Sequence, residues 1–146
     1  MLVDITVRDR ARLPVLAVEV KAVRGKDRQW AAQLRGSLVA HGFIQPARYF
    51  LLVTPEMSYL WDESVETANS ERPPDVVVAT ADLIGEDRLG DVHWDGRALE
   101  LLASSWLASI TDAAALEDLP EGGRRFLEES GLDRALRGGV VEFQAA

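Results

Sequence analysis

The 146-residue sequence predicts an α/β fold, in which a mixed central β-sheet is flanked by helices and the C-terminal region is helical. Short apolar segments with the period of a strand fill most of the first half, whereas apolar residues recur at helical spacing from residue 97 onward. The length suits one domain with a substantial hydrophobic core. We therefore expect a single domain, with a motif-bearing core at residues 1–61 and an acidic, mostly helical completion at residues 75–146.

Four strands are predicted in the core. Residues 2–7 alternate between two faces, and Asp4 lies on the more polar one. Residues 15–22 are almost continuously apolar, which is typical of a strand covered on both faces. The segments 48–53 and 58–61 are predicted to pair as a hairpin across a tight turn.

One helix is predicted between the second and third strands, from about residue 28 to residue 41. Asp27 can cap its N-terminus, and Gly42 is suited to end it. The side chains expected to face the core recur at helical spacing on one side: Trp30, Leu34, Leu38 and His41. Gln29 and Gln33 lie on an adjoining side.

The remaining chain alternates between loop, strand and helix patterns. Residues 62–74 are acidic and rich in turn formers, so we expect a loop there. Residues 75–83 predict a fifth strand, and residues 138–143 predict a short closing strand. Helical patterns occupy three segments, at 97–110, 123–130 and 132–137.

Scarce residue types exclude several kinds of site. Cysteine is absent, which removes disulfides, thiol catalysis, iron–sulfur clusters and zinc sites built from thiolates. The two histidines are too few for a three-histidine zinc site. We interpret His41 as an ordinary residue near a helix C-terminus, where a cation interacts well with the dipole, and His93 as part of a polar loop.

The sequence also predicts a cytoplasmic protein without a membrane partner. No stretch of about 18 uncharged apolar residues is present to cross a bilayer. The N-terminal segment lacks the basic start and the long apolar run of a signal peptide.

Charge is distributed unevenly along the chain. The net charge of −8 combines +5 in residues 1–55, from nine Arg/Lys and four acids, with −13 in residues 56–146, from seven Arg and twenty acids. A basic first third could face a polyanion, while the acidic remainder keeps the molecule soluble or meets a different partner. The alternative is that the basic and the acidic parts are both ordinary solvated surfaces, which would give the same distribution of charge.

The second predicted strand carries Glu19 and Lys21 on its less apolar face. If the first two strands form a hairpin whose paired residue numbers sum to 23, Asp4 lies opposite Glu19 and beside Lys21. Two carboxylates at that spacing can hold Mg²⁺, which takes few protein oxygens and keeps several waters. A neighbouring ammonium can stabilise charge that develops on a phosphoryl group. The pattern predicts metal-dependent phosphodiester hydrolysis, and its alternative is an ordinary ion pair across a hairpin.

These features resemble the PD-(D/E)XK nuclease superfamily. Asp4, a gap of fourteen residues, Glu19-Val20-Lys21 at the end of an apolar strand, a helix bearing glutamines and the segment YFLLVT occur in that order. Residues 33–61 are especially similar to the nuclease domains of type I restriction enzyme motor subunits and their stand-alone relatives. The resemblance covers residues 2–61 and implies a restriction-endonuclease-like fold.

The resemblance also implies roles for particular residues in DNA cleavage with Mg²⁺ or Mn²⁺. Asp4 and Glu19 would be the metal ligands, Lys21 the catalytic lysine, and Gln33 or Gln29 the glutamine that follows on the helix. Two features depart from the family pattern. The tyrosine that often follows the glutamine by four residues is missing, and so is the helix, sometimes carrying a further acid, that usually precedes the first strand. A partner chain could supply that helix.

The partners predicted for this protein are nucleic acid, with DNA preferred, and a protein partner or a second copy of the chain. Arg24, Lys26 and Arg28, with Arg12 as a further candidate, are expected to contact phosphates, which would make binding strongly salt-dependent. The alternative function is a catalytically degenerate nuclease fold that binds nucleic acid or protein within a larger complex. An unrelated nucleotide enzyme is not favoured, because the sequence lacks G-x-x-x-x-G-K-[ST] and its glycine pairs lack the spacing of a dinucleotide loop.

Overall fold

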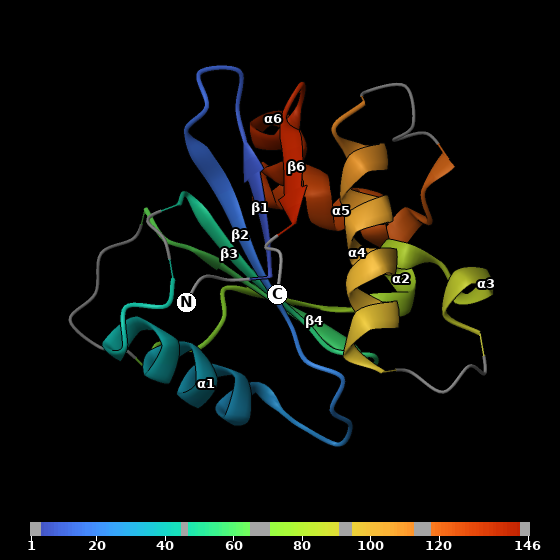
Figure 1. Ribbon diagram of the computed structural model, residues 1–146. Helices are drawn as coiled ribbons and strands as arrows, with labels where there is room; N and C mark the ends of the chain where they lie inside the picture. The colour runs from blue at the N-terminus through green and yellow to red at the C-terminus, as the bar shows by residue number, and fades with distance from the viewer. Residues whose placement is uncertain (1–3, 45–46, 65–70, 91–94, 113–117, 144–146) are drawn as a thin grey trace.

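A six-stranded mixed sheet with the strand order β5-β4-β3-β2-β1-β6 forms the centre of the protein, with helices on both of its faces (Figure 1). This is a computed structural model, and it describes five stretches of the chain, residues 4–44, 47–64, 71–90, 95–112 and 118–143. The predicted α/β class, with a mixed sheet flanked by helices, is confirmed. No helix in the described stretches is long and apolar enough to cross a membrane.

The strands follow the sequence pattern closely. Their bounds are β1 (Ile5–Arg8), β2 (Pro14–Val20), β3 (Tyr49–Val53), β4 (Met57–Asp62), β5 (Val76–Ala79) and β6 (Val140–Phe143). β2 and β3 run parallel, whereas the other neighbouring strands run antiparallel. A parallel pair requires a crossover connection, and the helix α1 (Arg28–Ala40) supplies it.

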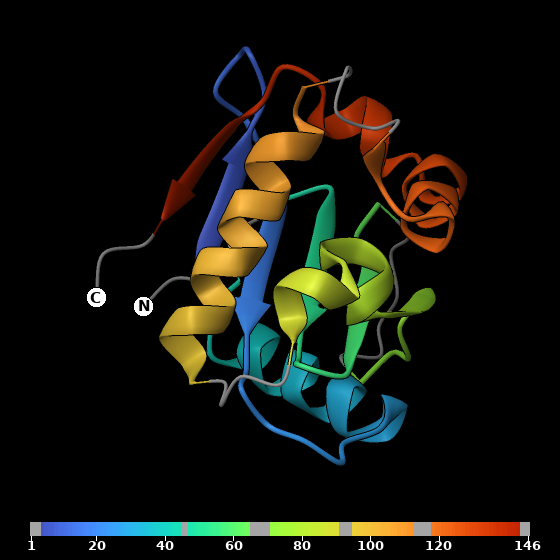
Figure 2. The same ribbon diagram turned by 90° about the vertical axis from the view of Figure 1, so that its right-hand side faces the viewer.

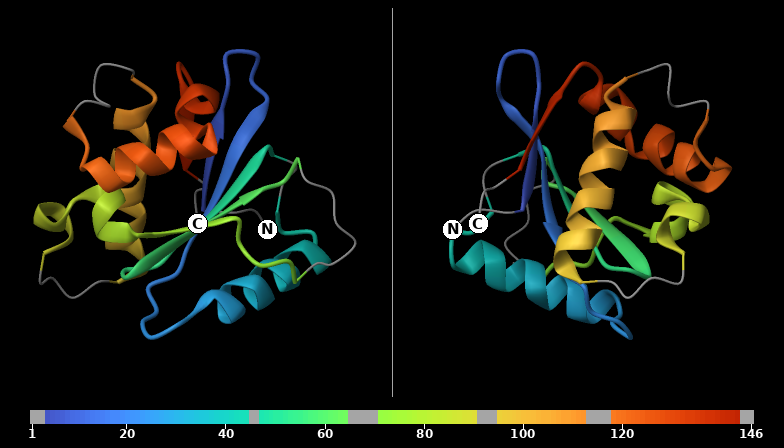
Figure 3. Two further views of the ribbon diagram at one scale, coloured as in Figure 1. Left: turned by 180° about the vertical axis from the view of Figure 1, so that it is seen from behind. Right: turned by 45° about the vertical axis from the view of Figure 1, so that its right-hand side comes forward.

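Two hydrophobic cores lie on opposite faces of the sheet. α1 covers the smaller core, which contains Phe50, Leu52 and Trp61. The larger core lies under the later helices, which are α2 (Thr80–Ile84), α3 (Glu86–Leu89), α4 (Gly96–Ile110), α5 (Glu121–Ser130) and α6 (Leu132–Leu136) (Figure 3). β3 alternates its side chains between the two cores, which explains why its sequence is apolar at every position.

The predicted fifth strand, residues 75–83, is wrong in its second half. β5 ends at Ala79, and residues 80–84 form α2 instead. The buried hydroxyl of Thr80 donates to the backbone oxygen of Thr54 at 2.7 Å and lies 2.8 Å from Ser58 Oγ. This anchor fixes the chain at the sheet edge, so the apolar residues that follow reach the larger core from a helix. α3 was not predicted.

The core side of α1 also differs from the prediction. Its buried residues are mostly small: Ala31, Ala32, Arg35 and Gly36. The predicted Trp30, Leu34 and Leu38 are partly buried beside them, and His41 is exposed. Small residues at the centre let the helix lie close to the sheet, so the larger side chains pack around its border. His41 is the C-cap, and its Nδ1 lies 2.7 Å from the backbone oxygen of Ser37.

The glycine pair at 122–123 has a packing role. A Cβ atom on Gly123 would collide with the backbone oxygen of Asp82, where α5 crosses α2. A Cβ on Gly122 would meet the side chain of the same Asp82, which can move. The close approach of these two helices therefore requires glycine at position 123.

Candidate functional site

The register of β1 and β2 brings two of the predicted site residues together. Ile5 pairs with Val18, so paired residue numbers sum to 23 as predicted, and the same register places Asp4 opposite Glu19. Asp4 directly precedes β1, and its Oδ2 accepts a hydrogen bond from the backbone N–H of Val20 at 2.8 Å. This bond fixes the Asp4 carboxylate at the end of β2.

Lys21 lies directly after β2 and beside Glu19. Its Nζ is 3.3 Å from Glu19 Oε1, and its backbone N–H donates to Val53 of β3 at 2.9 Å. The Glu19 side chain is only 5% exposed, whereas that of Lys21 is 42% exposed. The lysine is therefore held by a buried carboxylate while its ammonium group remains accessible to a substrate.

Glu100 on α4 is a third acid at this place, and the sequence did not identify it. α4 runs along the sheet beside β2 and β6 (Figure 2). Burial raises the pKa of Glu100, and the charge of Asp4 and a hydrogen bond with Asp4 raise it further, while Arg97 lowers it. Arg97 Nη1 lies 3.7 Å from Glu100 Oε2. The sequence offers one signal for Glu100, which is an acid within the apolar segment RALELLASSWL. The residues that Glu100 contacts nevertheless depend on how α4 packs.

Carboxylates outnumber cations in this cluster. Burial raises the pKa of Glu19 to about 7, with the charge of Asp4 as the second cause, while Lys21 opposes the rise. The hydrogen bond between Glu19 and Asp4 also favours the protonated form. Near neutral pH Glu19 therefore keeps its proton in part of the molecules, and a cation bound beside it could replace that proton.

The acids do not form a complete metal site by themselves. In the stretches that the structure describes, no three His, Asp or Glu side chains are grouped so that they could hold a metal ion. Two carboxylates nevertheless suit Mg²⁺, because it is commonly bound by one or two carboxylates together with waters and substrate phosphates. Asp4 and Glu19 provide two hard oxygen donors of the required kind.

The raised pKa of Glu19 predicts an unusual dependence of stability on pH in the metal-free protein. The folded state holds this proton up to about pH 7, whereas the unfolded chain releases it near pH 4.5. The contribution of protonated Glu19 to the free energy of unfolding is therefore present at low pH and is lost as the pH rises. The loss is expected to reach at most about 3 kcal/mol between pH 4.5 and 7. Glu19→Gln should remove it, so urea unfolding in EDTA should show the variant gaining stability over the wild type from pH 5 to pH 8. Parallel stability curves for the two proteins would contradict the assignment.

The predicted phosphate-binding residues lie on one exposed loop and at the start of α1. Arg24, Lys26 and Arg28 are exposed, and no ion pair joins them to another described residue. The backbone N–H of Gly25 donates to Glu56 Oε1 at 2.7 Å, which ties the loop to the turn after β3. These cations therefore follow Lys21 along the chain and remain free to meet an anion.

Other candidates form no hydrogen bond or ion pair with the cluster. Gln29 and Gln33 are exposed on α1, and in the described part of the chain the polar contacts of Asp4, Glu19 and Lys21 do not include Gln33. Arg12 lies in the turn between β1 and β2, at the opposite end of the hairpin from Asp4. Since β2 rises about 3.3 Å per residue, roughly 20 Å of strand separates Arg12 from Lys21.

The remaining histidine, His93, lies outside the described residues.

Neither a family model nor a curated protein nor a solved structure matches this chain.

Proposed function

We propose that this protein is an endonuclease that hydrolyses phosphodiester bonds in DNA with Mg²⁺ or Mn²⁺. The observation that supports this proposal most strongly is the convergence of Asp4, Glu19 and Lys21 at one end of the β1–β2 hairpin. A restriction-endonuclease-like arrangement of the core and the resemblance of residues 2–61 to the PD-(D/E)XK nucleases are part of the same proposal.

Asp4 and Glu19 would hold the metal ion, which when bound polarises a phosphoryl oxygen and lowers the pKa of a bound water. Asp4 is suited to this role because Val20 holds one of its oxygens in place and leaves the other outside that bond. Glu100 would add a third carboxyl group beside Asp4 from the α4 side, since the two acids share a hydrogen bond.

Lys21 would act on the reacting phosphate. Its ammonium group is exposed and oriented by the buried Glu19 carboxylate. It can donate hydrogen bonds to a phosphoryl oxygen and stabilise the negative charge that develops there as water attacks phosphorus. The same group can orient the attacking water, whose oxygen forms the new bond while the bond to the sugar oxygen breaks.

Arg24, Lys26 and Arg28 would contact the DNA backbone next to the scissile phosphate. We predict that Arg24→Glu with Lys26→Glu weakens DNA binding at least roughly tenfold at low salt and reduces the slope of log K against log [salt] by about two. Electrophoretic retardation in Ca²⁺, at several salt concentrations, measures both quantities.

A matched control has the same change in net charge at the other end of the hairpin. Arg134 and Arg137 lie around the β1–β2 turn with Arg10. Arg134→Glu with Arg137→Glu should leave the salt slope unchanged. Equal losses in the two double variants would mean that binding follows net charge, and they would contradict a phosphate-contacting loop.

The second candidate function is a nuclease-like module that binds nucleic acid or protein without cleaving. The exposure of Gln33, without a hydrogen bond to the other proposed site residues that the structure describes, and the acidic remainder of the chain favour it. Calorimetry with Mn²⁺ separates the two functions, because an endonuclease must bind the ion whereas a degenerate module need not. For either function we propose a cytoplasmic protein that associates with a protein partner or a second copy of itself.

A further inference from the structure

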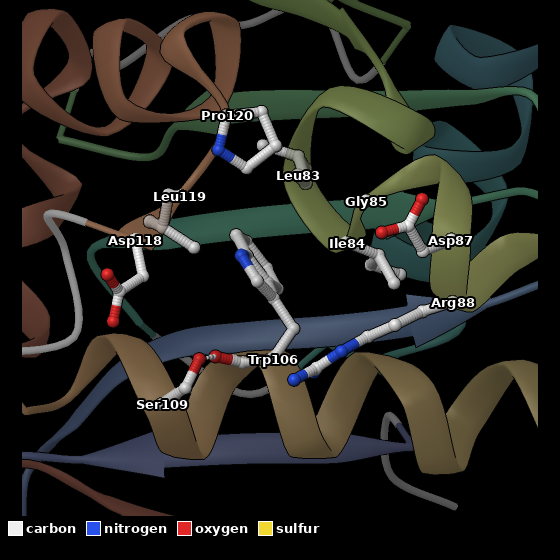
Figure 4. A pocket seen from close by; sticks show the side chains of 10 residues that line it. All are labelled: Leu83, Ile84, Gly85, Asp87, Arg88, Trp106, Ser109, Asp118, Leu119 and Pro120. Carbon is white, nitrogen blue, oxygen red and sulfur yellow. Dashed lines mark hydrogen bonds between the residues drawn. The ribbon is translucent and has the colours of Figure 1, made fainter.

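A pocket of about 370 Å³ lies between α2, α3, α4 and the start of α5, away from the acidic cluster (Figure 4). Its walls are largely apolar, with Leu83 and Ile84 on one side and Leu119 and Pro120 on another. Trp106 of α4 lines the pocket between them and is 2% exposed. This size and this lining are typical of sites that bind small molecules.

The indole N–H of Trp106 has no hydrogen-bond partner among the described residues. Nε1 is buried, and no backbone oxygen or side chain in the described part of the chain accepts its hydrogen. The other described buried tryptophan differs, because Trp61 Nε1 donates to the backbone oxygen of Arg72 at 2.9 Å. A buried N–H without an acceptor carries a free-energy penalty, so the Trp106 nitrogen is suited to a molecule that brings the acceptor with it.

Arg88 of α3 provides a second donor at this pocket. Figure 4 shows its side chain extending from α3 toward Trp106 and Asp118 lying on the other side of the indole. Arg88 is exposed, and no ion pair joins it to another described residue. A guanidinium next to an apolar wall suits the carboxylate of a ligand whose body is apolar.

Two carboxylates at the rim restrict the charge of the ligand. Asp87 and Asp118 are exposed and line the same pocket. With Arg88 as the one cation in the described lining, these charges act more strongly against a dianion such as a phosphate monoester than against a single carboxylate that pairs with Arg88. The lining therefore favours a monoanion over a dianion.

We propose that this pocket binds a small organic acid with an aliphatic or aryl-alkyl body. The apolar body would lie between Leu83 and Leu119, an oxygen of the ligand would accept from Trp106, and its carboxylate would pair with Arg88. This site does not depend on the nuclease proposal, since it shares no residue with Asp4, Glu19 or Lys21.

The test is calorimetric titration of the full chain with two probe acids, octanoate and 4-phenylbutyrate, and with 4-phenylbutyramide as a neutral match. At least one acid should bind, and Trp106→Phe should weaken its binding about fivefold, because the variant keeps an aromatic ring but lacks the indole N–H. Arg88→Gln should weaken it about tenfold and abolish the preference for the acid over the amide. Arg125→Gln, an exposed arginine outside the pocket, is the matched control and should bind like the wild type.

Three results would overturn the proposal. The first is that neither acid binds at millimolar concentration. The second is that Trp106→Phe and Arg88→Gln bind the acids with unchanged affinity. The third is that inorganic phosphate binds more tightly than the acids. Arg88 is exposed, so its variant is expected to fold and to remain informative if Trp106→Phe does not.

Discussion

Lys21→Ala is expected to lower the rate of DNA cleavage at saturating DNA by at least about a hundredfold, because it removes the cation that stabilises charge on the reacting phosphate. The Lys21 side chain is 42% exposed, and among the described residues its ion pair is with Glu19, so the variant should fold normally. Plasmid nicking under single-turnover conditions with Mg²⁺ or Mn²⁺ measures the rate, and circular dichroism checks the fold.

Lys26→Ala is the matched control for this experiment. Lys26 is exposed on the basic loop and is expected to act on binding alone. Its variant should need several-fold more DNA but reach the wild-type rate at saturation. A Lys21→Ala protein that cleaves as fast as the wild type at saturating DNA would refute the proposed role of Lys21.

Glu63→Ala is expected to destabilise the protein by about 3 kcal/mol, because it breaks a largely buried ion pair and leaves a charge without that partner. Arg35 Nε donates to Glu63 Oε1 at 2.8 Å and Nη2 donates to Oε2 at 2.6 Å. The Arg35 side chain is 7% exposed and lies over the Trp61 ring at 5.8 Å. Urea unfolding measures the loss.

The controls separate burial from charge. Arg125→Ala breaks the exposed pair with Glu121 and should cost no more than about 0.5 kcal/mol. The double variant Arg35→Met with Glu63→Leu should recover most of the stability lost in Glu63→Ala, since apolar replacements of a buried pair are often well tolerated. Equal losses for the exposed and the buried pair would contradict this explanation.

Local patterns predicted the strands at the centre of the sheet and the relative positions of Asp4, Glu19 and Lys21. Alternation along residues 2–7 and 15–22 specifies which faces can meet, and parity then restricts the hairpin register. Parity leaves every odd sum of paired residue numbers open, and the sum of 23 is the one that places Asp4 opposite Glu19. The pairing of Ile5 with Val18 has this sum. The position of Lys21 beside Glu19 follows from the same period of two.

Contacts between distant segments were not predictable from local patterns. Glu100 meets Asp4 only because α4 packs along the sheet, and nothing within its own helix indicates which strand end it reaches. Arg35 is buried because Glu63 arrives from beyond β4, 28 residues away. β5 stops at Ala79 because the Thr80 hydroxyl forms hydrogen bonds with Thr54 in the neighbouring turn and with Ser58 on the neighbouring strand.

The most direct test of the proposed site is an anomalous difference map from crystals soaked in Mn²⁺. The ion is expected between the carboxylates of Asp4 and Glu19, with Lys21 alongside, and the peak should be lost in Asp4→Asn crystals that otherwise keep the fold. A map without a peak at these carboxylates, in crystals whose site is open to solvent and held above pH 7.5, would contradict a metal-dependent nuclease.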